Sequence, residues 1–316
     1  MPIPIRNDRL LQNEVQVTWQ GPRVACAEGR PMLSLVLRLA YSNLWIALMA
    51  SAQTYVNSLI LGIKSPQACW LAGLSMFFVY TFAKTVRFDP QADFANDPER
   101  MTFLMRWRWP LIALASFGFL HGLQLTWGDP TRACLFVFPL VGAVLYDVKL
   151  LPAGYRYRRL KDITGVKSLV VAIIWGVLTT WLPVYDAGGS LLSAPVLGVT
   201  LYATLSMFIN TVYFDIGDMK GDRLEGIITL PLHWGLAGTV RRLHLINLLM
   251  AVGLGLMLHW GWLHPIAFWL QPMVLFNWVF LRQARSEESE LGFWCDVVVD
   301  GTYIFAALWM FLASEF

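Results

Sequence analysis

Three aspartates recur at a regular spacing in the segment 213–226. Asp215, Asp218 and Asp222 stand at positions i, i+3 and i+7. On a helix these positions lie within roughly 60° of one another over about 10 Å of rise, so the spacing predicts that the carboxylates share one face. Carboxylates held so close repel one another unless a cation neutralises them. Because hard oxygen ligands select Mg²⁺ or Ca²⁺, and Mg²⁺ usually completes its shell with substrate phosphates and water, the pattern predicts a magnesium site for a phosphorylated ligand.

A second acidic segment covers residues 84–100. Its Asp89 and Asp93 are one helical turn apart, and Pro90 predicts that any helix there begins just after Asp89. On its own this segment is a weak indication. If it meets the first segment in space, the two sets of carboxylates are suited to holding two metal ions around one diphosphate.

Basic residues crowd a third segment, between residues 146 and 167. Arginines and lysines in such a place are suited to stabilising a departing diphosphate. A basic loop is equally expected from membrane orientation and from contact with anionic lipid, so both interpretations stand. The segment contains Tyr146, Lys149, Arg156, Arg158, Arg159, Lys161 and Lys167.

The elements that position these segments are predicted to be membrane-spanning helices. Hydrophobic residues make up 57% of the 316-residue chain, charged residues only 14%, and the mean hydropathy is +0.53, which excludes an ordinary soluble enzyme. Apolar runs of spanning length, without the alternation of a barrel, predict an all-α fold. We expect nine helices in a bundle around a central cavity, at about 42–62, 67–83, 110–127, 133–148, 168–185, 191–212, 243–259, 262–281 and 294–313.

The distribution of basic residues predicts which ends of these helices face the cytoplasm. With nine spans, 22 of the 24 Lys and Arg residues fall on the side of the N-terminus, and only Lys64 and Arg132 fall on the other. We therefore expect a multi-pass protein with a cytoplasmic N-terminal segment, 1–41, and one transmembrane domain, 42–316. Both acidic segments then lie on the cytoplasmic side.

Two more carboxylates lie inside the last predicted span. Asp296 and Asp300 are one turn apart near its cytoplasmic end. Because carboxylates within a membrane are costly and usually face the interior of a bundle, both are candidates for lining the central cavity.

The aspartate ladder and the residues after it resemble the second aspartate motif of the UbiA superfamily of intramembrane prenyltransferases. The 84–100 segment is similar to the tail of the first motif, but Thr85-Val86 replaces the Asn-Asp that begins the NDxxDxxxD pattern, so one expected metal carboxylate is missing. Tyr146 to Lys161 is similar to the loop between the motifs, although Tyr157-x-x-x-Lys161 offers a competing alignment. The matching residues are Asp89, Asp93, Asn96, Pro98, Arg100, Asp215, Asp218, Asp222, Arg223, Gly226, Thr229, Pro231 and Gly235.

The resemblance implies an enzyme that uses Mg²⁺ to transfer an isoprenyl group from a prenyl diphosphate to an aromatic or other lipophilic acceptor within the membrane. It implies that Asp215, Asp218 and Asp222 hold one Mg²⁺ and that Asp89 and Asp93 help to hold another. The expected partners are these two substrates and membrane lipids, without nucleic acid. The residues expected to bind the substrate diphosphate are Arg87, Asn96, Arg100, Tyr146, Lys161, Lys220 and Arg223.

Two other functions remain open because the first motif is incomplete. A membrane terpene cyclase of the same superfamily would use the same ionisation and close the prenyl chain on itself. A non-catalytic protein that binds prenyl lipids would keep the fold and the diphosphate site without turnover. The product formed from a prenyl diphosphate, with and without an acceptor, distinguishes the three.

Overall fold

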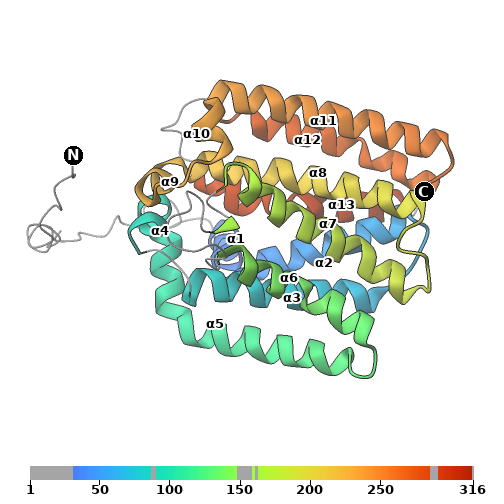
Figure 1. Ribbon diagram of the computed structural model, residues 1–316, viewed down its shortest axis with the longest axis horizontal. Coiled ribbons are helices and arrows are strands. Elements are labelled where there is room, and N and C mark those ends of the chain that lie inside the picture. The colour runs from blue at the N-terminus through green and yellow to red at the C-terminus, as the bar shows by residue number, and fades with distance from the viewer. Residues whose placement is uncertain (1–30, 87–89, 148–158, 161–162, 285–290, 315–316) are drawn as a thin grey trace, which may run out of the picture. The chain divides into compact units, whose positions relative to one another are not determined.

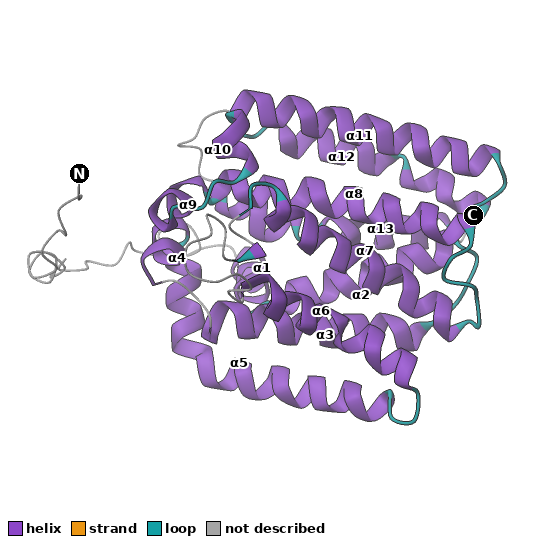
Figure 2. Ribbon diagram, in the orientation of Figure 1, coloured by secondary structure: helices purple, strands orange, loops and turns teal. Residues whose placement is uncertain are grey.

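The computed structural model describes residues 31–86, 90–147, 159–160, 163–284 and 291–314. The chain divides into a unit of residues 1–35 and a larger unit, Val36–Phe316, which contains the helical bundle considered below. Helices and short loops account for the described residues, and no strand occurs among them (Figure 2). The predicted all-α fold is confirmed.

The helices follow one another with short connections (Figure 1). In chain order they are α1 (Pro31–Tyr41), α2 (Leu44–Ile60), α3 (Pro66–Val86), α4 (Pro90–Asn96), α5 (Pro98–Leu125), α6 (Pro130–Asp147), α7 (Val166–Asp186), α8 (Ala194–Gly217), α9 (Met219–Glu225), α10 (Leu230–Trp234), α11 (Leu236–His259), the 3₁₀ helix η2 (Pro265–Leu270), α12 (Pro272–Leu281), the π-helix η3 (Trp294–Val299) and α13 (Thr302–Ala313).

Several of these helices are long and apolar enough to cross a membrane. Among the described residues there are five, or six if α1 and α2, which are bent by 83° at a short break, form one span. Shorter apolar helices cover Pro130–Leu145 and Pro265–Leu281. The number of nine crossings stays a prediction.

The start of α5 differs most from its expected position. A span was expected from about residue 110, yet the helix begins at Pro98. The Asp97 side chain accepts a hydrogen bond from the Arg100 amide at 2.9 Å, and Pro98 occupies the first turn, where its missing N–H costs nothing. This early start carries Arg100 into the same end of the bundle as α4.

Glycines allow neighbouring helices to pack closely. A Cβ at Gly176 in α7 would lie 2.1 Å from Thr204 Oγ1 and 3.0 Å from the Thr200 carbonyl oxygen, both in α8. A Cβ at Gly73 in α3 would lie 2.4 Å from Ser51 Oγ in α2. Small residues at such contacts are typical of helices that associate within a membrane.

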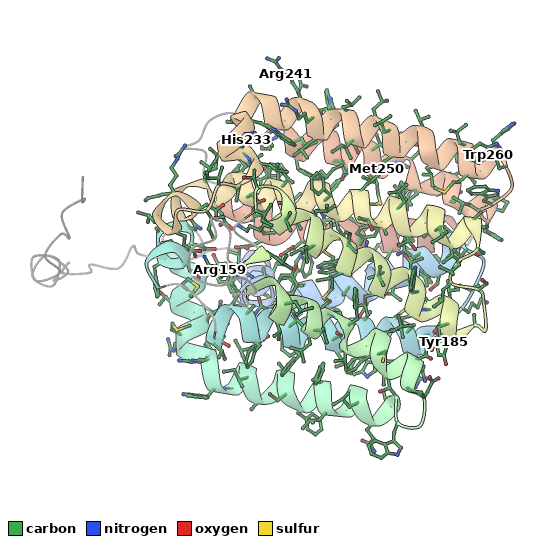
Figure 3. All side chains as sticks on the ribbon, in the orientation of Figure 1. Arg159, Tyr185, His233, Arg241, Met250 and Trp260 are labelled. Carbon is green, nitrogen blue, oxygen red and sulfur yellow. The ribbon has the colours of Figure 1, made fainter. Side chains whose placement is uncertain are left out.

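The short helices α4, α9 and α10 lie together at one end of the long helices, which we call the cap end (Figure 1). Arg159 lies at this end, whereas Tyr185 and Trp260 lie at the opposite end (Figure 3). The opposite end has its own polar contacts, including an ion pair between Arg132 and Asp186 with N···O 2.9 Å. The bundle therefore places both acidic segments at one end.

Replacing Gly176 with Ala should destabilise the protein by about 1–3 kcal/mol, because the added methyl group meets backbone atoms of α8 that cannot move freely. Gly253→Ala in α11 is the matched control, since nothing lies within 4 Å of the added carbon. It should stabilise the helix by up to about 1 kcal/mol. Thermal unfolding in detergent measures both, and equal melting temperatures would contradict the close α7–α8 contact.

Candidate functional site

The two acidic segments meet at the cap end. Helix α4, from the first segment, packs against α9, from the second. The Gly221 amide donates a hydrogen bond of 2.8 Å to Asn96 Oδ1, which ties the two helices together. Asn96 was expected to bind diphosphate, and the structure gives its carboxamide oxygen this different partner.

Asp215 and Asp222 face one ammonium group. Lys167, in the first turn of α7, places Nζ 2.9 Å from Asp215 Oδ1 and 3.1 Å from Asp222 Oδ1. Ser168 Oγ donates to Asp215 Oδ2 at 2.5 Å. Both carboxylates are buried. Two of the three predicted ligands therefore surround a single position that a cation occupies.

Asp218 lies between these carboxylates in sequence and interrupts the helix. Asp218 is the C-cap of α8 and the N-cap of α9, so the three aspartates do not belong to one continuous helix. Among the described residues its side chain has no hydrogen bond or ion pair. Burial raises the pKa of Asp218, against the opposing effect of Lys84 and Lys167.

The electrostatic cost of this arrangement is visible at Asp222. Burial raises the pKa of its carboxyl group to about 7, although the nearby Lys167 ammonium acts to lower it, and the charges of Asp215 and Asp218 raise it further. A carboxyl group with this pKa is only partly ionised at neutral pH. An added divalent cation would favour its ionised form.

The first acidic segment contributes fewer described carboxylates to the cap end than the second. Lys84 Nζ lies 3.1 Å from Asp93 Oδ1 in a partly exposed ion pair. Asp89 and Arg87 lie outside the described residues. Thr85, at the head of the motif, is buried and donates its hydroxyl to the Thr81 carbonyl oxygen at 2.5 Å.

The residues expected to bind diphosphate differ in their exposure and in their partners. Lys220 and Arg223 are exposed on α9 at the cap end. Arg100 is buried and donates to Asp296 Oδ1 at 2.6 Å and to Asn43 Oδ1 at 2.9 Å. Tyr146 belongs to α6, but its side chain, like all of Lys161, lies outside the described residues. Contact of any of them with diphosphate stays a prediction.

The donor set fits Mg²⁺ through two carboxylates. No group of three His, Cys, Asp or Glu side chains within the described ranges is close enough to hold a metal ion. Mg²⁺ needs only one or two protein carboxylates when phosphate oxygens and water supply the rest. Asp215 and Asp222 already converge on one ammonium, and Asp218, between them in the chain, has no hydrogen bond or ion pair with another residue in the described part of the chain. Asp215 and Asp222 are the two residues whose carboxylates would hold the metal in this arrangement.

Lys167 is the main contributor that the sequence pattern did not identify. Lys167 is part of the basic segment 146–167, whose positive charge is also expected from membrane orientation. Its role depends on the first turn of α7 lying beside the end of α8, two helices that are extensively packed together. The spacing of residues within one segment cannot predict a contact between two helices.

Comparison with known proteins agrees with the fold and identifies the family. The profile of the UbiA prenyltransferase family matches residues 105–297, and the chain belongs to that family. A UbiA homolog from Archaeoglobus fulgidus bound to GPP and Mg²⁺ has a similar structure, with TM-score 0.56 and 10% identity over 89% of this chain and 99% of that one. The same homolog bound to DMAPP and Mg²⁺ gives TM-score 0.53 and 12% identity over the same shares. No curated protein sequence matches.

The family and the apolar helices together define a multi-pass integral membrane protein. At 10–12% identity the solved structures establish the shared fold.

Replacing Lys167 with Met should strengthen Mg²⁺ binding in the absence of diphosphate by about tenfold, because the metal no longer has to displace an ammonium group. Lys220→Met, which removes an exposed lysine of α9, is the control and should change the affinity little. Isothermal titration calorimetry in detergent measures both. Equal or weaker binding by Lys167→Met would show that Lys167 does not occupy the metal position.

The metal-free protein should lose stability as the pH rises through about 7. The pKa of Asp222 is raised in the folded state to about 7, so the folded protein binds a proton that the unfolded chain releases near pH 4. This contribution is complete below pH 4 and disappears above pH 7. Chemical denaturation in chelator between pH 5 and 8 measures it, and Asp222→Asn should flatten the dependence. An unchanged slope in that variant would assign the effect elsewhere.

Proposed function

We propose that the protein uses Mg²⁺ to transfer an isoprenyl group from a prenyl diphosphate to an aromatic or other lipophilic acceptor within the membrane. The convergence of Asp215 and Asp222 on the Lys167 ammonium carries this proposal, because it is a preformed cation position at the end of an apolar bundle. Membership of a prenyltransferase family and the similarity to a homolog bound to GPP or DMAPP with Mg²⁺ support it.

Asp215, Asp218 and Asp222 are the proposed ligands of one Mg²⁺, and Asp93 with Asp89 helps to hold a second. Bound Mg²⁺ would supply positive charge to the diphosphate as its bond to the prenyl carbon breaks. The lysines now paired with carboxylates, Lys167 and Lys84, are then available to diphosphate oxygens. Both already lie among the acidic residues, so we expect rotation of their side chains to bring them to diphosphate oxygens.

The apolar helices supply the other requirement of the reaction. An allylic cation formed on ionisation reacts with water unless water is excluded, and a lipophilic acceptor reaches the site through the membrane. We propose that residues 42–316 form the transmembrane catalytic domain and that the N-terminal segment and the cap end face the cytoplasm. The positions of the basic residues support this orientation.

Replacing Asp218 with Asn should lower prenyl transfer by about 100-fold or more, because a metal ligand is lost where charge develops in the transition state. The measurement is mass spectrometry of the lipids lost when the gene is deleted in its host and regained on complementation. Asp129→Asn, which removes a carboxylate that accepts a hydrogen bond from Tyr185 at the opposite end, should complement fully.

Complementation by Asp218→Asn at the wild-type level would refute the catalytic assignment. Incubation of the purified protein with geranyl diphosphate and Mg²⁺ but no acceptor tests the closest alternative. A cyclised hydrocarbon from that incubation would identify a terpene cyclase instead.

A further inference from the structure

A groove of about 680 Å³ opens between α11 and α12, and its described walls share no residue with the magnesium site. The two helices pack against each other and lie side by side at an edge of the bundle (Figure 1). Helix α11 is the least buried of the five long apolar helices in the described part of the chain. A volume of this size is typical of small-molecule sites. The residues of this α11–α12 groove that matter below are Val240, His244, Trp278, Val279, Arg282 and Gln283.

Hydrogen bonds between the two helices hold the walls of the groove together. Asn277 Nδ2 in α12 donates to Asn247 Oδ1 in α11 at 3.0 Å, and Asn247 Nδ2 donates to the Val274 carbonyl oxygen at 2.8 Å. Asn247 stands one helical turn after His244, and Asn277 directly precedes Trp278. Side-chain hydrogen bonds of this kind join neighbouring helices within a membrane. The two walls of the groove are therefore held at a fixed register.

Pairs of arginine and tryptophan indicate the depth of the groove in the membrane. The Arg282 guanidinium carbon lies 4.2 Å from the ring centroid of Trp278, and that of Arg242 lies 4.6 Å from the ring centroid of Trp234 in α10. Tryptophan rings and long basic side chains both favour the headgroup level of a bilayer. Val240 lies four residues, or about 6 Å, from the start of α11. The groove therefore opens at the level of the lipid headgroups.

The charge of the groove is positive. Arg282 is exposed at the C-cap of α12, and Arg241 is exposed on α11, where it points away from the bundle (Figure 3). None of the described residues that line the groove carries a carboxylate. A guanidinium group that stacks on a ring through its face has its N–H donors around its edge. Charge complementarity therefore favours an anionic occupant.

The inner walls combine polar and apolar surface. His244 Nδ1 is buried and has no hydrogen-bond partner among the described residues, although buried polar atoms are normally satisfied. Gln283 adds an amide, which has both donor and acceptor atoms. Val240 and Val279 supply apolar surface between these groups. The groove is therefore suited to an amphiphile that has an anionic, oxygen-rich head and an apolar chain.

We propose that the α11–α12 groove binds one anionic phospholipid. The lipid phosphate lies at Arg282, headgroup oxygens hydrogen-bond to His244 and Gln283, and the acyl chains pack against Val240 and Val279. Basic pockets between membrane helices are suited to such headgroups. A free phosphate ion would satisfy the charge and leave the apolar walls uncovered. The inference is independent of the proposed transfer reaction, because none of these residues belongs to the proposed catalytic set.

Native mass spectrometry of the full chain in detergent tests the headgroup contact. The probes are dioleoyl phosphatidylglycerol and dioleoyl phosphatidylcholine, which share their acyl chains and differ in net charge. The wild type should bind one phosphatidylglycerol about fivefold more tightly than phosphatidylcholine, and Arg282→Gln should remove this preference. Arg106→Gln, which removes an exposed arginine of α5, is the matched control and should retain it.

A second variant tests the groove without changing any charge. Val279→Trp places a ring in the groove at an exposed position, so the protein should fold and lose one bound phosphatidylglycerol. Leu275→Trp, one turn earlier on α12 and also exposed, is the control and should keep that lipid. The same mass spectra report the number of bound lipids and the oligomeric state of each variant.

Three results would overturn the inference. Equal affinity for phosphatidylglycerol in the wild type and Arg282→Gln would show that the headgroup does not bind at this arginine. Displacement of the lipid by excess inorganic phosphate would assign the groove to a free phosphate ion. A wild-type dimer that Val279→Trp converts to a monomer would show that a second copy of the chain covers the groove.

Discussion

Buried carboxylates at the end of an apolar bundle repel one another, and the rest of this structure depends on how that repulsion is relieved. The Lys167 ammonium lies within 3.1 Å of both Asp215 and Asp222, and it draws the first turn of α7 against the end of α8. Relief is incomplete, since burial still raises the pKa of Asp222 to about 7. The ionised form of Asp222 is thus still disfavoured when Lys167 is its partner, and a cation of higher charge would stabilise it better.

The same constraint explains why polar helices gather at one end of the protein. Residues of α4, α9 and the start of α5 bring charge of both signs to the cap end (Figure 1), while the long helices remain apolar. The opposite end is simpler, with the Arg132–Asp186 pair and the Tyr185–Asp129 hydrogen bond closing its loops. The two acidic segments are unequal, because Thr85 hydrogen-bonds within α3 and contributes no carboxylate. If the protein takes an unusual substrate, we expect the contacts that select it to lie in the segment 84–100.

The sequence predicted those features that repeat within a single segment. Hydrophobic runs predicted the all-α fold, and the spacing of Asp215 and Asp222 predicted carboxylates that lie close together, as their shared contact with Lys167 shows. It did not predict that α5 begins at Pro98, because the polar first turns of that helix lack the signal of a membrane span. Contacts between distant segments were equally hidden. Lys167 beside Asp222, and Arg100 beside Asp296, result from packing of helices far apart in the chain.

We propose that the carboxylates around Lys167 form the magnesium diphosphate site. A crystal structure with Mn²⁺ and the unreactive analogue geranyl S-thiolodiphosphate, with the metal located by anomalous scattering, tests it most directly. We expect Mn²⁺ to be coordinated by Asp215, Asp218 or Asp222, with Lys167 moved from the carboxylates to the diphosphate. Metal and analogue bound away from α9, with Lys167 still paired to Asp215 and Asp222, would contradict it.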